Sequence, residues 1–222
     1  KNWVDAHIKE ILGDLLNLNK ETVGNKYIRA LMFQLFENNG VIKRELVGDI
    51  VKAVKTEERK KIWALGIKIG RYHIYLPKML KPKAVSLRIS LWRLFYQFAI
   101  NQDIPRSGLN YLIDKKYDKN FLLLCGFEKF KNHYVRIDIL EKLFIKILNK
   151  TENRKFKIDA EMINLIGCNK EGFYSLMLSM NYKKGKETDT YFYSGEGKRK
   201  NKFVNIKKDE NPFKKLLALN IK

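Results

Sequence analysis

Residues 67–77 read Ile67-Lys68-Ile69-Gly70-Arg71-Tyr72-His73-Ile74-Tyr75-Leu76-Pro77, and this stretch decides how the chain is expected to fold. Apolar and polar residues alternate with a period of two on either side of Gly70-Arg71, which is the pattern of a β-hairpin. The alternation predicts an outward side of the hairpin that carries Lys68, Arg71, His73 and Tyr75.

Helical spacing surrounds this hairpin. Before it, apolar residues recur at helical intervals over residues 3–18, 22–38 and 46–54, and Thr56 can cap a fourth helix that ends near Trp63. The segment Asn38-Asn39-Gly40 supplies the stop signal of the second helix. Helices followed by a basic hairpin are the order of a winged-helix unit, so we expect one here.

Another helix is predicted after the hairpin, with Pro82 in its first turn. The side chains expected on its buried face are Leu87, Leu91, Leu94, Phe95 and Phe98. Residues 101–118 are polar and contain Pro105 and Gly108, so they are predicted to form a linker or loop.

The second half of the chain repeats the order of elements. A buried segment at 121–124 and a strand at 134–137 precede Asp138 to Glu141, which resembles a capping box at the start of a helix that ends near residue 148. Asp159 is expected to cap a helix over 160–166. Gly167-Cys168-Asn169 is expected to form a turn before a helix over 170–180. With a strand at 191–193, this order predicts a helix-turn-helix with a wing, although such a helix pair can also simply pack a core.

The predicted fold class is therefore mainly α, with helical bundle lobes, short β-hairpins and winged-helix-like units. The expected domains are a helical lobe with a basic hairpin (1–100), a linker (101–118), a second winged-helix-like lobe (119–195) and a basic tail (196–222).

The charge is strongly positive and unevenly distributed. Lys and Arg number 45 against 24 Asp and Glu, a net charge of +21, of which residues 43–93 carry +10 and residues 183–222 carry +7. Basic chains most often bind nucleic acid, and less often an anionic membrane or an acidic partner. Because Lys (35) greatly exceeds Arg (10), AT-rich codon usage accounts for part of this charge.

Several classes of protein are excluded. No apolar run is long enough to span a membrane, and acidic residues within the first 16 positions exclude a secretory signal. Cys125 and Cys168 are too few for a disulfide scaffold or a cysteine zinc site, so we expect a reducing, cytoplasmic setting. We also expect a monomer with no membrane partner. The chain begins at Lys1, and we expect it to be a piece of a longer protein.

The motifs of catalysis and metal binding are missing from the sequence. It has no phosphate-binding loop and no His-Glu-x-x-His, and its three histidines lie on separate predicted elements. The carboxylate pairs stand where helix starts favour negative charge. We therefore expect this chain alone to be no enzyme and to hold no metal or cofactor.

Candidate nucleic-acid contacts fall in three groups. Cations just after the hairpin and at a helix N-terminus suit phosphates; these are Lys78, Lys81, Lys83 and Arg88. On the hairpin, Lys68 and Arg71 suit phosphates and Tyr75 can stack on a base, unless Tyr72 and Tyr75 pack a small sheet. The tail contributes a basic run, which is either a phosphate contact or a solvated linker: Lys198, Arg199, Lys200 and Lys202.

Several short segments together resemble one family. They are Gln34 to Gly40, Leu65 to Gly70, Tyr72 to Pro77, Leu80-Lys81-Pro82, Leu91-Trp92, Val135 to Glu141, Leu165 to Cys168 and Asn211-Pro212-Phe213. Over nearly the whole chain the sequence resembles the C-terminal region of alpha-proteobacterial superfamily-two ATP-dependent helicases, relatives of the mitochondrial RNA-degradation helicase. The stretch from Leu65 to Pro82 is the most specific part. One departure is Asn181 before Tyr182, where the family tends to have Gly, and Asn tolerates the left-handed backbone that ends a helix.

The resemblance implies an accessory region that follows two RecA-like motor domains, whose ATP and magnesium sites would lie upstream of this chain. It implies a part in the path of single-stranded RNA or DNA, and no catalytic residue of the family falls on these positions. The alternative is a protein-interaction module that docks a ribonuclease or another partner, supported by the net-neutral, apolar first 42 residues. A third reading, an independent DNA-binding regulator, would need a dimer.

Overall fold

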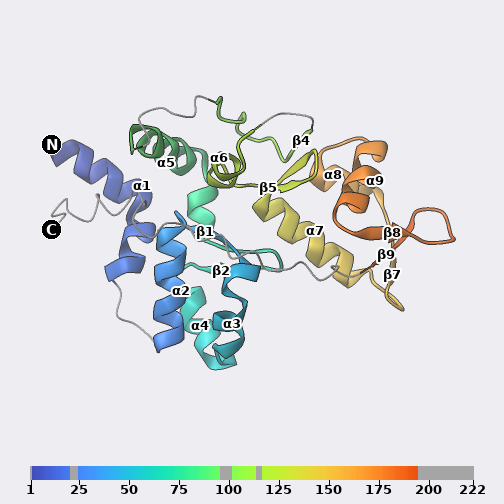
Figure 1. Cartoon of the computed structure of the whole chain (residues 1–222), viewed down its shortest axis with the longest axis horizontal. Coiled ribbons are helices and arrows are strands. Elements are labelled where there is room, and N and C mark those ends of the chain that lie inside the picture. Colours follow the sequence, from blue (N-terminus) through green and yellow to red (C-terminus); the bar gives the residue numbers. More distant parts are fainter. Residues whose placement is uncertain (1, 21–24, 96–101, 114–116, 195–222) are drawn as a thin grey trace. The chain divides into compact units, whose positions relative to one another are not determined.

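The computed structural model describes residues 2–20, 25–95, 102–113 and 117–194 (Figure 1). The described residues form helices and three small antiparallel sheets of three strands each, which confirms the predicted fold class. They group into two compact units, one with the residues up to 104 together with 123–126, the other with 105–122 and the residues from 127 on. The division between Ile104 and Pro105 lies inside the segment predicted as a linker.

The first unit contains the predicted helices and hairpin. Its elements are α1 (Asn2–Lys20), α2 (Lys26–Glu37), β1 (Val41–Lys43), the 3-10 turn η1 (Arg44–Val47), α3 (Gly48–Ala53), α4 (Thr56–Ala64), β2 (Lys68–Ile69), β3 (His73–Tyr75), the 3-10 turn η2 (Pro77–Leu80) and α5 (Pro82–Phe95). Strand β1, which the sequence analysis missed, pairs with β3, so the sheet order is β1-β3-β2. From α2 to β3 the order is helix, strand, helix, helix and hairpin, as a winged-helix unit requires.

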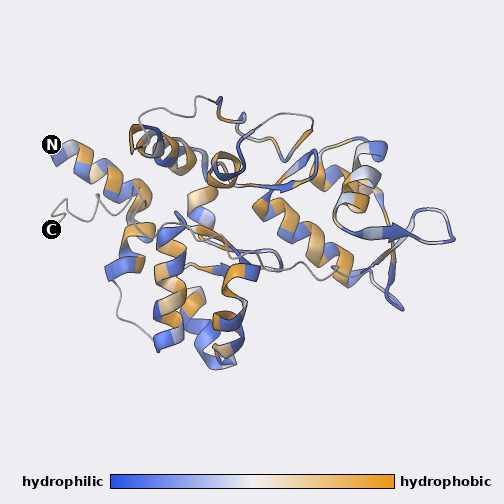
Figure 2. Ribbon diagram, viewed as in Figure 1, coloured by the Kyte–Doolittle hydropathy of each residue, from blue (hydrophilic) through white to orange (hydrophobic). Residues whose placement is uncertain are grey.

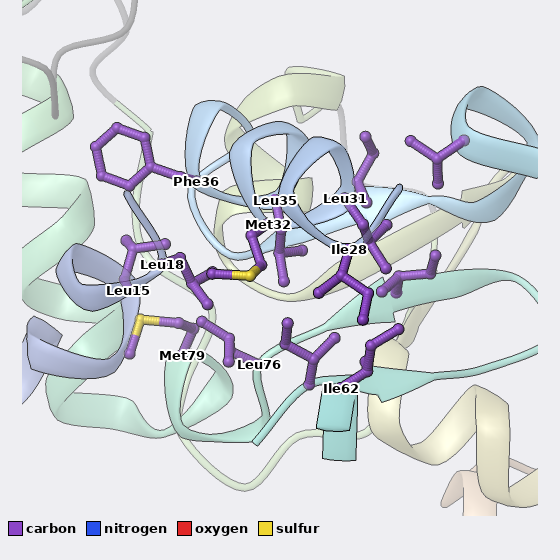
Figure 3. Close-up of a cluster of buried hydrophobic side chains, with 14 of the residues drawn as sticks. Leu15, Leu18, Ile28, Leu31, Met32, Leu35, Phe36, Ile62, Leu76 and Met79 are labelled. Atoms are coloured by element: carbon purple, nitrogen blue, oxygen red, sulfur yellow. The ribbon is translucent and has the colours of Figure 1, made fainter. Parts of the chain in front are cut away.

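One hydrophobic core holds this unit together. Buried side chains of α1, α2 and α4 and of the segment after β3 point toward one another in Figure 3; they include Leu15, Leu18, Ile28, Leu31, Met32, Leu35, Phe36, Ile62, Leu76 and Met79. Those of α2 follow the three- and four-residue spacing of one helix face, as predicted. This core is therefore apolar, and charged side chains lie outside it.

Gly40 lies between α2 and β1, in the segment that was predicted to stop the helix. Its φ is +85°, and a Cβ atom there would lie 2.7 Å from Cγ of Met79, so both the backbone and the space favour glycine. Its carbonyl oxygen accepts a hydrogen bond from the Leu76 N–H at 2.9 Å. Thr56, in contrast, does not cap α4: the helix already includes Thr56, and Glu58 accepts from the Lys55 N–H at 3.1 Å.

The buried face of α5 differs from the predicted one. The buried residues are Ala84, Val85, Arg88, Ile89 and Trp92. Leu87 and Leu91 are only half-buried, Leu94 is 63% exposed, and Phe98 lies outside the described residues. Two apolar stripes with the same spacing run along this helix. The stripe that is buried is adjacent to the one that was predicted.

The second unit begins with a strand inside the predicted linker. Its elements are β4 (Tyr111–Ile113), α6 (Lys119–Leu124), β5 (Phe127–Phe130), β6 (His133–Arg136), α7 (Ile137–Asn149), β7 (Lys155–Lys157), α8 (Ala160–Ile166), α9 (Lys170–Ser179), β8 (Tyr182–Lys184) and β9 (Thr190–Tyr193). The end of α6 groups with the first unit. The sheets have the orders β4-β6-β5 and β7-β9-β8. Figure 2 shows how strongly apolar α7 is, in keeping with its six buried positions.

From α7 to β9 the second unit has the winged-helix order, and its sheet has the same spatial order as β1-β3-β2 of the first unit. Two local predictions are confirmed here: Asp159 caps α8 by accepting from the Met162 N–H at 2.8 Å, and Asn181 after α9 has a left-handed φ of 68°. The capping box at Asp138 is wrong. Helix α7 already begins at Ile137, so Asp138 lies inside it, and its carboxylate instead binds the guanidinium of Arg136 at 2.6 and 3.0 Å.

Over the part of the chain that the structure describes, no helix is both long and apolar enough to cross a membrane.

Candidate nucleic-acid interface

The basic surface of the first unit runs from α4 through the hairpin to the start of α5. From Arg59 to Gln102 the chain has ten Lys and Arg and neither Asp nor Glu. Among the predicted contacts, Lys68, Arg71, Lys78, Lys81 and Lys83 are exposed. Lys78 pairs with Asp14 across 2.9 Å between Nζ and Oδ2, which neutralises part of its charge. Lys81 and Lys83 flank Pro82 at the N-terminus of the 14-residue helix α5, whose first turn has no acidic residue.

Tyr75 does not lie on an outward side of the hairpin. Strand β3 is the central strand of its sheet, and all three of its residues, His73, Ile74 and Tyr75, are buried. The predicted stacking role of Tyr75 is therefore wrong, and the alternative, that it packs a small sheet, holds. The error arose because the pairing partner Val41, which lies opposite Tyr75 on β1, was not predicted as a strand.

Arg88 was predicted to contact phosphate and is instead fully buried. Its Nη1 donates to the Asn39 carbonyl oxygen at 2.6 Å, and its Nη2 donates to the carbonyl oxygens of Met79 and of Leu124, the latter at 3.0 Å. Burial lowers the pKa of the Arg88 guanidinium to about 10, which leaves it charged at neutral pH. Its two terminal nitrogens are thus paired with main-chain carbonyl groups inside the unit, and no phosphate can reach this buried side chain.

Helix α4 carries candidate contacts that the sequence analysis did not single out. Ile62 is its one buried residue, whereas Arg59, Lys60 and Lys61 are exposed and Trp63 is 70% exposed. Trp63 follows Arg59 by four residues and Lys60 by three, so these side chains share one helix face. The signal was the run of three basic residues, 59–61, followed by Ile62 and Trp63, which the sequence analysis used only to place a helix.

The two acidic residues of α4, Glu57 and Glu58, both lie in its first turn. Glu58 accepts hydrogen bonds from the side chain of Asn25, at 2.5 Å, and from the Lys55 N–H, so its carboxylate is occupied at the start of the helix. Acidic groups at a helix N-terminus stabilise the helix. The residues that follow are therefore left to present positive charge and an indole ring to solvent.

The corresponding helix of the second unit, α9, is not basic. Its Lys170 pairs with Asp189 at 3.2 Å, and Glu171 is exposed. The hydrogen bond from Tyr174, followed by the contact with Lys170, lowers the pKa of the Asp189 carboxyl. The predicted helix-turn-helix is present as α8 and α9, but its second helix lacks the cations that phosphate contact needs. Lys198, Arg199, Lys200 and Lys202 lie outside the described residues.

The second unit also contains a hydrogen-bonded histidine. His133 on β6 contacts the Tyr111 hydroxyl with Nδ1 at 2.6 Å and the Ser175 hydroxyl with Nε2 at 3.0 Å. Both ring nitrogens of this buried side chain are thereby satisfied. The three residues come from β4, β6 and α9, so this chain of hydrogen bonds joins elements within the unit.

The two thiols are poor nucleophiles. Burial raises the pKa of Cys125 to about 12, against the smaller opposing effect of Arg88 and Arg93, and burial raises the pKa of the half-buried Cys168 to about 11. Both are therefore protonated thiols at neutral pH. Within the described ranges, no group of His, Cys, Asp and Glu residues has an arrangement that could hold a metal ion.

A hollow of about 270 Å³ lies beside the Lys78–Asp14 pair of the first unit. Asn17, Leu18, Leu65 and Gly66 also line it, so it joins α1 to the end of α4. Its lining is partly charged and partly apolar.

Comparison with known proteins finds no family model, no curated protein and no solved structure that matches this chain.

Proposed function

We propose that this chain is a nucleic-acid-binding accessory region of an ATP-dependent RNA or DNA helicase. The observation that carries the proposal is the acid-free segment 59–102, which presents exposed cations on α4, on the hairpin and at the start of α5. Such cations release condensed counterions when they contact phosphates, and this release is the main source of sequence-independent affinity. Single-stranded RNA or DNA is the proposed ligand.

In this proposal the ATP and magnesium chemistry belongs to motor domains outside this chain. The chain itself contributes to the path of the strand and performs no reaction. The proposed place next to motor domains rests on the sequence resemblance alone, whereas the exposed cations also support the proposed binding of a strand. A reducing, cytoplasmic setting suits the proposal, because Cys125 and Cys168 are both free thiols.

The test is a titration of labelled single-stranded RNA and DNA at several salt concentrations. Replacement of the exposed pair by Lys81→Glu/Lys83→Glu is expected to weaken binding by about tenfold or more and to reduce the salt slope by roughly 0.7 for each lost phosphate contact. The matched control is Lys119→Glu/Lys142→Glu, which changes the same charge at exposed positions of other helices. If both double variants change affinity equally, the effect is one of net charge and the proposed interface is wrong.

A second candidate function is a docking module for a ribonuclease or another protein. The observation in its favour is the exposure of large apolar side chains in the net-neutral first 42 residues: Trp3 is 74% exposed on α1, and Phe33 is exposed on α2. Large exposed apolar residues are enriched at protein interfaces. A pull-down with a purified ribonuclease that survives nuclease treatment, and that Trp3→Ala or Phe33→Ala abolishes, would favour this function.

A further inference from the structure

The outer face of the β7-β9-β8 sheet in the second unit carries an aromatic ring between two lysines. On β9, Phe192 lies opposite Lys155 of β7 on one side and opposite Lys183 of β8 on the other. Residues that are directly opposite in an antiparallel sheet point to the same face. Lys155, Phe192 and Lys183 therefore form one row across all three strands.

This row faces away from the core of the unit. The alternate residues Phe156, Tyr182 and Tyr191 are buried, and the ring of Phe156 packs against those of Tyr182 and Tyr191 at centroid distances of 5.4 and 6.4 Å. Successive residues of a strand point to opposite faces. The half-buried Phe192 and the exposed Lys155 and Lys183 thus belong to the outward face.

The lysines of this face form no ion pair among the described residues, although Glu152 lies opposite Lys155 in an isolated bridge. Lys157, which lies two residues after Lys155 on the same side of β7, is also exposed. As far as the structure describes the chain, Lys155, Lys157 and Lys183 have no acidic partner, in contrast to Lys170, which pairs with Asp189. The cations of this winged helix that remain available to an anionic ligand are therefore on the sheet and not on α9.

We propose that this face binds a segment of single-stranded nucleic acid. Phe192 stacks on one unpaired base, and Lys155, Lys157 and Lys183 contact the phosphates on either side of it. The inference rests on the proposed function and extends it with a second contact surface, in the other unit. It differs from the usual helix-turn-helix mode, because the sheet provides the contacts where the second helix would.

The chemistry of the row favours a nucleic-acid strand. Base–aromatic stacking tolerates any base sequence, and flanking cations follow the phosphate backbone, which together are the properties of a platform for single strands. Neighbouring strands lie about 4.8 Å apart, so the two lysines of the row start roughly 10 Å apart and can reach phosphates on both sides of one base. A duplex has no unpaired base to offer, so the face should prefer single strands.

The first experiment measures the affinity of the full chain for a single-stranded oligonucleotide. Phe192→Leu is expected to weaken binding by about fivefold or more, and Phe192→Tyr and Phe192→Trp to retain it. Lys155→Gln/Lys183→Gln is expected to reduce the salt slope by roughly 1.4. Matched controls are Leu178→Ala for loss of an exposed apolar side chain in the same unit and Lys119→Gln/Lys142→Gln for loss of charge.

The second experiment varies the ligand, and its measurements on wild-type protein do not depend on how the variants fold. Wild-type protein is titrated with oligonucleotides in which one nucleotide at a time is abasic, and one abasic position should weaken binding. The same abasic position should not weaken binding by Phe192→Leu any further, because that variant has already lost the stacking ring. Ultraviolet cross-linking should join the strand to the peptide that contains Phe192.

The outcomes separate the two proposals. If Lys81→Glu/Lys83→Glu weakens binding but Phe192→Leu, Lys155→Gln/Lys183→Gln and the abasic strands do not, the sheet face is not a contact surface and the proposed function stands. If the wild-type chain binds no single strand, both proposals are overturned. Equal affinity for duplex and single strands, with no effect of Phe192→Leu, also overturns the sheet proposal.

Discussion

The guanidinium of Arg88 donates a hydrogen bond from Nη2 to the main-chain carbonyl oxygen of Leu124, 3.0 Å away. Two further carbonyl groups, those of Asn39 and Met79, accept from the same guanidinium. One buried cation therefore joins three segments of the first unit that are far apart in the sequence, and it does so where a surface role was predicted.

Replacement of Arg88 is expected to affect stability directly. Arg88→Met removes all three hydrogen bonds and leaves buried carbonyl groups unsatisfied, so the free energy of unfolding should fall by about 3 kcal/mol or more. The measurement is urea unfolding followed by circular dichroism, with Arg88→Lys as the variant that keeps the charge but cannot reproduce the fork of donors. A variant that keeps the wild-type midpoint and binds RNA more weakly would show that Arg88 is a surface contact after all.

The two glycines Gly40 and Gly13 are expected to respond in opposite ways to alanine. At Gly40 a φ of +85° and the close approach of Met79 make a Cβ atom unfavourable, so Gly40→Ala should destabilise the chain by about 1–2 kcal/mol. At Gly13, inside α1, no atom lies within 4 Å of the added Cβ, and Gly13→Ala should stabilise by about 0.5–1 kcal/mol. Thermal unfolding of both variants tests the pair, and a shift of the same sign in both would contradict it.

The thiol of Cys125 should make stability depend on alkaline pH. Because burial raises its pKa from 9.0 to about 12, the folded state holds the proton more tightly than the unfolded state does. The stability that it contributes is fully present below pH 9 and is lost as the pH rises toward 12, by about 1.4 kcal/mol per pH unit. The Cys125→Ala variant has no thiol, so its stability lacks this contribution.

Urea unfolding of wild type and Cys125→Ala at pH 8, 9 and 10 measures the effect. The difference in the free energy of unfolding between wild type and variant should shrink as the pH rises through this range. A difference that stays constant would mean that the thiol ionises as readily in the folded chain as in the unfolded one.

Alanine variants of Trp63 and Trp3 should distinguish the two candidate functions. Both are largely exposed, so replacement of either by alanine should leave the unfolding midpoint nearly unchanged. If α4 contacts nucleic acid, Trp63→Ala should weaken binding of single-stranded RNA by about fivefold, because a stacking or cation-flanked ring is lost. Trp3→Ala is the control in this measurement, and an equal loss in both variants would rule out a specific role for α4.

Signals confined to a few residues predicted the local structure well. Asp159 caps α8, Gly40 stops α2 and Asn181 ends α9 in the left-handed conformation, each as expected. These features depend on hydrogen bonds and backbone dihedral angles within one or two turns, and such interactions are determined by residues close together in the sequence. The same reason explains why the helices, the hairpin and the mainly α fold class were predicted.

The candidate site was predicted less well, because exposure depends on distant partners. Lys68, Arg71, Lys78, Lys81 and Lys83 are exposed as expected, since lysine and arginine seldom bury their charge. Arg88 is the exception, and its three carbonyl partners span residues 39 to 124. The residues next to Arg88 in the sequence therefore do not predict its partners.

By itself the sequence determined the periodicity of the helices, their caps and the segment that holds most of the positive charge. Only the tertiary structure decided which of two equivalent apolar stripes of α5 is buried, that β1 covers one edge of β3 and Tyr75 is buried, and that Lys155, Phe192 and Lys183 meet in one row. The physical reason is the same in each case. Burial and strand register are set by the surface that packs against an element, and that surface comes from residues far away in the chain.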